Sequence, residues 1–268
     1  MMKSYGITEQ TVITDKINLH VESVLLKGFS VEENALEPAI CKEYCGLLDK
    51  VYQEQETEFG KEQLQSINEL DMARMPFIYE RKFIDLFTSP LVINIAEKIL
   101  GKNFQLHLQN GIINKPNKEH HQTSWHRDLP YQDWVISKPL GFNAFYCLTD
   151  FTSNNGSTVV LPHSHKMDHF PSNQYVENNL LQLNAPAGSI IFFDSMIYHR
   201  ASFNQSENTR YGLNNMFVVP IIKQQVDIPK CMTYELNEFE KQILGFNYQI
   251  PLDVLNFRNN RLNKINKK

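Results

Sequence analysis

The sequence predicts a mainly β protein with flanking helices, built around a double-stranded β-helix, or jelly-roll, core. From Asn103 onward, short runs rich in branched and aromatic residues recur at regular intervals, which is the pattern of an antiparallel β fold. The runs are separated by turn residues, notably at 153–156 and 185–188, that supply the backbone conformations of tight hairpins. Before Asn103 the apolar spacing is helical instead.

The N-terminal third is expected to hold one strand and two helices. Residues 24–29 alternate enough to predict a first strand. Apolar residues then recur at helical spacing behind an acidic start, which predicts a helix over residues 30–56. A second helix is predicted over residues 91–100, because Pro90 suits the first helical position and Gly101 the position after the end.

The β region and the C-terminal segment complete the predicted order. The expected strands cover residues 104–114, 141–148, 158–161, 180–183, 189–193 and 212–219. A short helix over residues 235–244 is expected to end at Gly245, and the basic, asparagine-rich tail after it is expected to be mobile.

These elements predict one elaborated domain. Residues 1–22 form an N-terminal segment, residues 23–230 form the domain with its jelly-roll core at about 103–220, and residues 231–268 form a C-terminal helix and basic tail.

Composition excludes several classes of protein. The 268 residues are 42% hydrophobic and 21% charged, which is typical of a folded globular chain and not of a disordered one. The net charge is −4 and the basic residues are scattered, so we expect no nucleic-acid partner. The longest apolar runs are too short to cross a membrane, so we expect no membrane partner. The sequence carries no signal for an oligomeric state.

The cysteines and the N-terminus bear on the compartment. Four cysteines show no paired pattern, and Cys41 and Cys45 lie one helical turn apart, where geometry disfavours a disulfide. The N-terminal residues lack the apolar stretch of a signal peptide. We therefore expect a cytoplasmic protein with free thiols.

Two short motifs carry the chemistry. His126 and Asp128 are two residues apart, so on an extended segment both side chains point the same way and can bind one metal ion. His199 arrives late in the β region, and Arg210 follows it eleven residues later at the start of a predicted strand. Two imidazoles and one carboxylate leave coordination positions open on iron, as in non-haem Fe(II) oxygenases. A guanidinium beside them can bind a carboxylate through two parallel hydrogen bonds.

Together with these motifs, several further pieces of sequence carry a resemblance to a known family. They are Ile-Asn-Lys-Pro at 113–116, Trp-His-Arg-Asp at 125–128, the segment 155–162, Ser164-His165, and His199 with Arg210. Over about residues 29–219, the chain resembles the phytanoyl-CoA dioxygenase family of Fe(II)/2-oxoglutarate-dependent oxygenases, which have a cupin-like jelly-roll core.

The resemblance implies a cofactor, a cosubstrate and an activity. His126, Asp128 and His199 would bind Fe(II), and Arg210 would bind the distal carboxylate of 2-oxoglutarate. Thr158 would assist Arg210. The enzyme would consume 2-oxoglutarate and O2, release succinate and CO2, and hydroxylate a C–H bond. Related halogenases lack the carboxylate at the position of Asp128, so its presence disfavours halogenation.

Further residues are assigned to the site by the same resemblance. Thr123 and Gln109 would lie near the cosubstrate or the substrate. The chain departs from the family pattern at Ala201, where a small hydroxyl residue is common, and at Phe145, where many relatives have tryptophan. The departure at Ala201 places one cosubstrate hydrogen bond in question.

The substrate is the least determined part of the prediction. Tyr131, Trp134 and Arg74 are candidate substrate-binding residues, although core or surface roles are equally compatible with each. A small-molecule biosynthetic intermediate is favoured over the alternative, a fatty acyl-CoA, because no basic patch for the phosphates of coenzyme A is recognisable. The remaining histidines, including His20 and His163, are expected to lie outside the ligand set.

Two other functions remain open at this stage. The first is a non-redox, metal-dependent jelly-roll isomerase or ligand-binding protein, since a fold does not determine its chemistry. The second is a catalytically silent domain. Arg210 argues against the first, which has no general need of a carboxylate clamp, and the complete His126, Asp128 and His199 set argues against the second.

Overall fold

Two antiparallel sheets form the centre of the protein. The computed structural model describes residues 12–118, 121–129 and 134–266. The six-stranded sheet has the order β1-β7-β4-β9-β3-β2 and comprises β1 (Phe29–Glu32), β2 (Met72–Arg74), β3 (Gln105–Asn114), β4 (Gly141–Cys147), β7 (Ile190–Asp194) and β9 (Arg210–Val218). The three-stranded sheet has the order β6-β5-β8 and comprises β5 (Thr158–Val160), β6 (Leu181–Gln182) and β8 (His199–Ala201). The jelly-roll prediction is confirmed.

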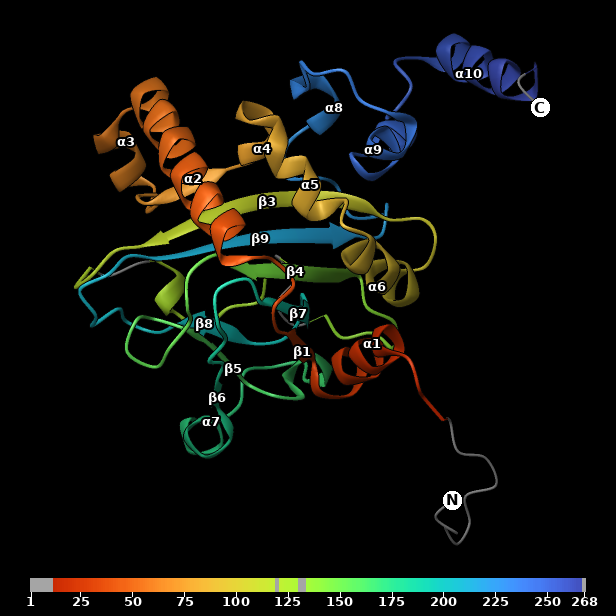
Figure 1. Cartoon of the computed structure of the whole chain (residues 1–268). Helices are drawn as coiled ribbons and strands as arrows, with labels where there is room; N and C mark the ends of the chain where they lie inside the picture. Colours follow the sequence, from red (N-terminus) through yellow and green to blue (C-terminus); the bar gives the residue numbers. More distant parts are fainter. Residues whose placement is uncertain (1–11, 119–120, 130–133, 267–268) are drawn as a thin grey trace, which may run out of the picture.

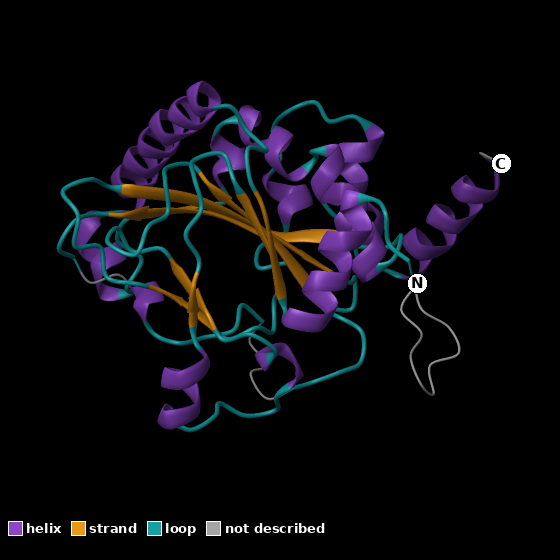
Figure 2. Cartoon of the chain, turned by 60° about the horizontal axis from the view of Figure 1, so that its bottom comes forward, coloured by secondary structure: helices purple, strands orange, loops and turns teal. Residues whose placement is uncertain are grey.

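Most of the helices cover the outer face of the large sheet, whereas one lies beside the small sheet and the last stands apart, as Figure 1 shows. The helices are α1 (Lys16–Lys27), α2 (Pro38–Phe59), α3 (Lys61–Ser66), α4 (Pro76–Tyr79), α5 (Ile84–Phe87), α6 (Pro90–Leu100), α7 (Asn173–Asn179), α8 (Ile228–Cys231), α9 (Glu238–Ile243) and α10 (Val254–Asn266). Single 3-10 turns lie between them at η1 (Arg81–Phe83), η2 (His121–Thr123), η3 (Ser164–Lys166) and η4 (Phe246–Tyr248). Figure 2 shows the small sheet on the side of the large sheet away from most of these helices.

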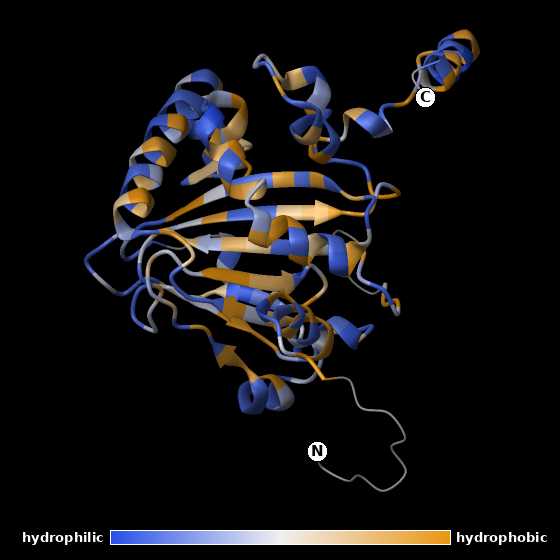
Figure 3. Cartoon of the chain, turned by 45° about the vertical axis from the view of Figure 1, so that its right-hand side comes forward, coloured by the Kyte–Doolittle hydropathy of each residue, from blue (hydrophilic) through white to orange (hydrophobic). Residues whose placement is uncertain are grey.

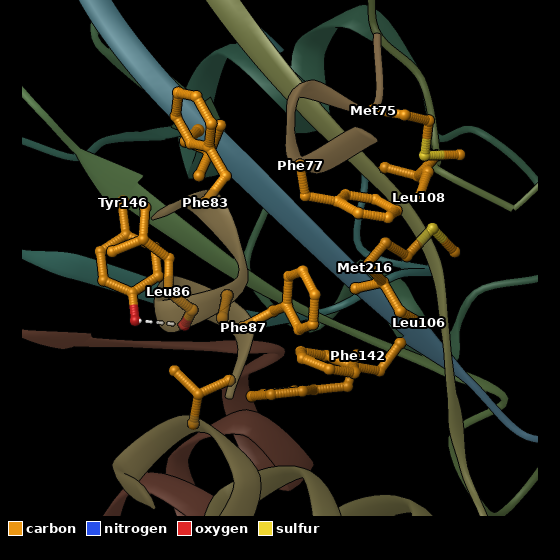
Figure 4. Packing of buried hydrophobic residues seen from close by; sticks show 14 of the residues in the cluster. Met75, Phe77, Phe83, Leu86, Phe87, Leu106, Leu108, Phe142, Tyr146 and Met216 are labelled. Atoms are coloured by element: carbon orange, nitrogen blue, oxygen red, sulfur yellow. Dashed lines mark hydrogen bonds between the residues drawn. The ribbon is translucent and has the colours of Figure 1, made fainter. Parts of the chain in front are cut away.

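The main hydrophobic core lies between the helices and the large sheet. Figure 4 shows aromatic and methionine side chains from α4, α5 and the strands interleaved in this layer. The Tyr146 hydroxyl donates to the Leu86 carbonyl at 2.7 Å, so the polar end of a buried side chain is satisfied. Gly111 permits the close approach of α2, because a Cβ there would lie 2.3 Å from Leu48 Cδ2.

A second, smaller core lies between the two sheets. It is formed by buried side chains of the large sheet, the small sheet and the loops that join them, among them Ile112, Phe145, Phe151, Val160 and Phe193. Residues of this inner layer surround the cavity described below. The division into two cores follows from strand alternation, since successive side chains of one strand point to opposite faces.

Several predicted elements are confirmed with small changes in their ends. The helix over residues 91–100 is α6, with proline in its first turn and Gly101 after its end. The six predicted strands correspond to β3, β4, β5, β6, β7 and β9, although β6 has only two residues. The helix predicted for residues 30–56 begins later, at Pro38, because β1 occupies residues 29–32.

The strand predicted at residues 24–29 is wrong. These residues form the last turn of α1 and the start of β1. Asp15 caps the helix by accepting from the Asn18 backbone N–H, and Gly28 ends it with a φ of 93°. These two capping signals outweigh the short apolar alternation on which the prediction rested.

The C-terminal tail contains a helix that the sequence analysis does not predict. Residues 254–266 form α10, which stands apart from the rest of the chain in Figures 1 and 3. Several of its apolar residues are exposed, such as Leu255 at 67% and Ile265 at 67%. Within the described part of the chain, no helix combines the length and apolar character that crossing a membrane requires. The four cysteines are free thiols, as predicted.

Candidate metal centre

Main-chain hydrogen bonds hold the segment around His126 against the two sheets. His126 and His199 form an isolated antiparallel bridge, in which each backbone N–H donates to the carbonyl of the other at 3.0 Å. The Asp128 backbone N–H donates to the Ser195 carbonyl, also at 3.0 Å. Residues far apart in sequence are thus brought together by the backbone itself.

The side chains of His126, Asp128 and His199 converge on one point. One ligand atom from each lies within 4.8 Å of the others. Asp128 Oδ1 is 3.7 Å from His126 Nε2 and 3.5 Å from His199 Nε2. The structure therefore brings the three predicted ligands together, and the donor set suits a divalent transition metal.

Backbone carbonyls set the tautomer of both histidines. His126 Nδ1 is 2.8 Å from the Ser124 carbonyl, and His199 Nδ1 is 3.1 Å from the Ile197 carbonyl. Because a carbonyl oxygen only accepts, each Nδ1 carries the proton in the neutral imidazole. The lone pair of each Nε2 then points toward the common centre, which is the form required of a metal ligand.

The electrostatics of the cluster favour an ionised carboxylate. Burial alone would raise the pKa of Asp128, but the charges of His199 and His126 and hydrogen bonds from His199 and Asn214 outweigh it, so the pKa falls to about 2. Burial opposes the charged form of His199, yet the neighbouring Asp128 carboxylate raises its pKa overall. A proton and a cation would thus compete for the same imidazoles.

Arg210 lies beside this cluster at the start of β9. Its side chain is 1% exposed, and its Cζ lies 4.5 Å from the centre of the Phe151 ring. Burial lowers the pKa of the guanidinium to about 10, so it remains cationic at neutral pH. Among the described residues, Nε and Nη1 of Arg210 have no hydrogen-bond partner. A buried cation with unused donors is costly, and this arrangement fits a site that binds an anion.

One cavity joins the cation and the metal cluster. Its lining residues are Ile112, Gln122, Asp128, Phe145, Thr158, Phe193, His199, Arg200, Ala201, Arg210 and Asn214. Thr158 lines the same cavity as Arg210. The residues that depart from the family pattern also line this cavity: Phe145 from the large sheet and Ala201 from the small sheet.

Gln109 does not reach the cavity. Its side chain is fully buried on the helix-facing side of β3, where it donates to the Phe83 carbonyl at 3.0 Å and to Asn215 Oδ1 at 2.7 Å. It also accepts from the Phe77 backbone N–H at 3.2 Å. Strand alternation gives the physical reason. Ile112, which lines the cavity, is three residues from Gln109 on the same strand, so the two side chains point to opposite faces of the sheet.

The other predicted residues are more scattered. Thr123 lies in η2, but its neighbour Gln122 lines the cavity instead. Arg74 lies in β2, outside the cavity lining, and forms an ion pair with Glu69 at 2.5 Å. Trp134 is 52% exposed and is also outside the lining. Tyr131 falls outside the described residues.

Three of the histidines outside the ligand set, His20, His163 and His165, have structural partners. His163 Nδ1 and His165 Nε2 lie 2.8 Å and 3.1 Å from the carbonyls of Leu26 and Leu25, so both satisfy carbonyls at the end of α1. His20 is 6% exposed, and its ring nitrogens contact Ser30 Oγ and Glu32 Oε2.

Two asparagines that the sequence did not single out contact the cluster. Asn143 on β4 and Asn214 on β9 both donate to Asp128 Oδ2, at 2.6 Å and 3.2 Å. Asn214 could have been found from the sequence, since it is four residues from Arg210 on the same strand and therefore faces the same side of the sheet. Asn143 depends on the pairing of β4 with β9, which no local pattern reveals.

The chain resembles proteins of one family along most of its length. The family profile described as Phytanoyl-CoA dioxygenase matches residues 25–212. An uncharacterized protein of Mycobacterium tuberculosis is 31% identical over 214 residues, which is 76% of each sequence. An ectoine dioxygenase of Nocardia farcinica is 24% identical over 227 residues, covering 72% of this chain and 73% of the relative.

A solved structure shares the fold. The epimerase SnoN, crystallised with Fe3+, alpha-ketoglutarate and nogalamycin RO, matches with a TM-score of 0.60 at 14% identity. The match covers 76% of this chain and 84% of that one. At this identity the likeness establishes the fold of the two sheets and their helices.

Proposed function

The chain belongs to the phytanoyl-CoA dioxygenase family of Fe(II)/2-oxoglutarate-dependent oxygenases, and from this premise we propose that it hydroxylates a C–H bond of a small-molecule biosynthetic intermediate. The observation that carries the proposal is a cavity lined both by Asp128 and His199, two members of the candidate metal cluster, and by the buried guanidinium of Arg210. A metal site alone fits many activities. A metal site beside a buried anion-binding cation fits a chelating, dicarboxylate cosubstrate.

The residues present fit both groups. Two neutral imidazoles and one ionised carboxylate form the donor set of non-haem Fe(II) oxygenases, with His126, Asp128 and His199 as the proposed ligands. The free Nε and Nη1 donors of Arg210 suit a carboxylate, which would accept two parallel hydrogen bonds. When bound, Fe(II) with 2-oxoglutarate and O2 supplies the oxidising chemistry, with release of succinate and CO2.

The chain contributes placement and exclusion of water. Arg210 of the large sheet would hold the distal carboxylate of 2-oxoglutarate, and Thr158 of the small sheet, which lines the same cavity, would assist it. Ile112, Phe145 and Phe193 give this end of the cavity apolar walls, which strengthens the interaction between opposite charges by excluding solvent. Asp128 stays ionised throughout the physiological pH range.

The kind of substrate is supported by relatives. Curated relatives include an ectoine dioxygenase of Nocardia farcinica and the dioxygenase olcK of Penicillium canescens. Ectoine is a small metabolite and not an acyl-CoA. A small metabolite also agrees with the scattered basic residues of this chain, which offer no recognisable site for the phosphates of coenzyme A. We therefore favour a small substrate and propose residues 23–230 as the catalytic domain.

Binding of the cofactor and cosubstrate is tested first. Purified protein with Fe(II) and ascorbate should gain thermal stability when 2-oxoglutarate is added, because a ligand that binds only the folded state stabilises it. His126→Ala should lose both iron and this stabilisation. His169→Ala is a matched control, since His169 is highly exposed and its ring pairs with the neighbouring Asp168. Wild-type protein that binds neither iron nor 2-oxoglutarate would refute the proposal.

The reaction is tested by screening metabolites for stimulated succinate release. Mass spectrometry of the product then distinguishes the outcomes, since hydroxylation adds one oxygen atom and epimerisation leaves the mass unchanged. The second outcome has to be examined because the structural neighbour SnoN is an epimerase. Activity on phytanoyl-CoA alone would overturn the preference for a small metabolite. Turnover with zinc and without succinate would instead support the non-redox alternative.

A further inference from the structure

The two carboxylate oxygens of Asp128 have different surroundings. Oδ1 faces both imidazoles, at 3.7 Å from His126 Nε2 and 3.5 Å from His199 Nε2. Oδ2 instead accepts hydrogen bonds from Asn143 Nδ2 at 2.6 Å and from Asn214 Nδ2 at 3.2 Å. One oxygen is thus directed at the metal position, and the other is used by the protein.

The amides around Oδ2 form a directed network. The Ser195 hydroxyl donates to Asn143 Oδ1 at 2.5 Å, which orients that amide so that its Nδ2 faces Asp128. The Asn143 Nδ2 also donates to Asn214 Oδ1 at 2.9 Å, which in turn directs Asn214 Nδ2 to Asp128. Each amide has its orientation determined by a neighbour, so both donors end on the same oxygen.

The network is built into the interior. Asn143 and Ser195 are fully buried, and Asn214 is 9% exposed on the cavity wall. The Ser195 carbonyl also accepts from the Asp128 backbone N–H, so the same residue holds both the main chain and, through Asn143, the side chain. Gly141 leaves space for Ser195, because a Cβ there would lie 2.5 Å from Ser195 Oγ.

We propose that Asn143 and Asn214, oriented by Ser195, are positioning residues that restrict the Asp128 carboxylate to binding a metal through Oδ1 alone. The inference rests on the proposed function, since it concerns the metal of that site. A carboxylate can bind a cation through one oxygen or two. Binding through Oδ2 would compete with these two hydrogen bonds and displace at least one of them, which is unfavourable for a buried amide N–H.

The consequence for the reaction lies in the number of open positions. Two histidines and a single carboxylate oxygen leave room for both oxygens of a chelating cosubstrate and for O2. A second carboxylate oxygen on the metal would occupy one of these positions. Loss of either amide should therefore weaken the binding of 2-oxoglutarate to the metal-loaded protein. Metal binding should weaken for a separate reason, because the carboxylate loses the hydrogen bonds that orient it.

The test uses full-length, metal-free protein, Co(II) as an air-stable probe and calorimetric titration. Asn214→Leu removes the donor at nearly constant volume, and Asn143→Leu does the same at the other amide. Asn215→Leu is the matched control, because Asn215 is the next residue on β9 but bonds to Gln109 and the Ala144 carbonyl on the opposite face. Ser195→Ala tests the orienting role, and circular dichroism checks that each variant is folded.

We expect both site variants to bind Co(II) about 10- to 100-fold more weakly than wild type, the range typical for partners of metal ligands. At saturating Co(II), their affinity for 2-oxoglutarate should also fall. Ser195→Ala should show the same two changes with smaller size, and Asn215→Leu should lose only stability. If Asn143→Leu does not fold, Asn214→Leu on the cavity wall carries the test alone.

Two negative results have different meanings. If Asn214→Leu binds Co(II) and 2-oxoglutarate like Asn215→Leu, the positioning role is wrong and the metal site stands. If wild type does not bind Co(II), or His199→Ala binds it equally well, the proposed metal site fails and this inference fails with it.

Discussion

Asp194 is a buried carboxyl whose ionisation opposes folding. It lies at the end of β7, 3% exposed, and its Oδ1 accepts from the Met196 backbone N–H at 2.9 Å. Burial raises its pKa from 3.8 to about 6, although the Met196 hydrogen bond and the charges of Lys166 and Arg127 act in the opposite direction. We expect Asp194→Asn to stabilise the protein at neutral and alkaline pH.

The size and sign of the effect follow from linkage. A pKa raised by about 2 units in the folded state corresponds to about 3 kcal/mol. Because the folded-state pKa is the higher one, the stability contribution is complete below pH 3.8 and is lost as the pH rises through about 6. The asparagine oxygen can still accept from the Met196 N–H, but its amide buries two N–H groups where the protonated carboxyl buries one O–H. We therefore expect the free energy of unfolding to rise by about 1–3 kcal/mol at pH 8.

The assay is urea unfolding of wild type and Asp194→Asn at several pH values from 4 to 8. The stability difference should grow with pH and level off above about pH 7. Asp168→Asn, at an exposed position, removes the same charge and serves as the control. A difference that does not change with pH, or one that favours wild type at pH 8, would refute the reasoning.

Three further predictions concern the anion site, the end of α1 and the helix–sheet contact. Arg210→Met should raise the KM for 2-oxoglutarate about 100-fold, because two charge-assisted hydrogen bonds are lost, while iron binding is retained. An unchanged KM would exclude Arg210 from cosubstrate binding. His165 should make the fold acid-sensitive, because burial, chiefly, lowers its pKa from 6.5 to about 4. Because the folded-state pKa of this histidine is lowered, stability that is present above pH 6.5 is lost as the pH falls toward 4. His165→Gln should therefore reduce the acid-induced loss of unfolding free energy by about 2–3 kcal/mol in urea unfolding. An equally steep loss in the variant would contradict this. Gly111→Ala should cost about 1–3 kcal/mol, since its Cβ would lie 2.3 Å from Leu48 Cδ2. Leu48→Ala should then lower the free energy of unfolding less in the Gly111→Ala variant than in wild type. If chemical denaturation shows that the two losses add, the two positions do not compete for space.

Local patterns predicted the elements whose signals are local. Proline at the start and glycine after the end predicted α6, and runs of branched and aromatic residues predicted β3, β4, β7 and β9. The strand at residues 24–29 failed because a short apolar run fits either period, and only the caps at Asp15 and Gly28 distinguish them.

Some residues of the candidate site could be predicted from local sequence, and others could not. The two-residue spacing of His126 and Asp128 is local, and the structure brings both to His199, although the ligand roles remain predictions. Gln109 was misplaced because its face depends on strand register, and Asn143 was missed because it meets Asp128 only through pairing of β4 with its neighbours. Register is a long-range property that single-sequence patterns do not encode.

The backbone bridge between His126 and His199 has a consequence for metal choice. Because main-chain hydrogen bonds already hold these residues together, a cation does not have to close the long loop between them, and the entropy of loop closure is supplied by folding. A site formed in this way is open to any divalent ion of suitable size. The affinities should then follow the usual order for such ligands, in which copper and nickel bind more tightly than iron. Occupancy by iron would then reflect the supply of metals in the cell more than discrimination by the protein, and the metal found after purification would record the growth medium.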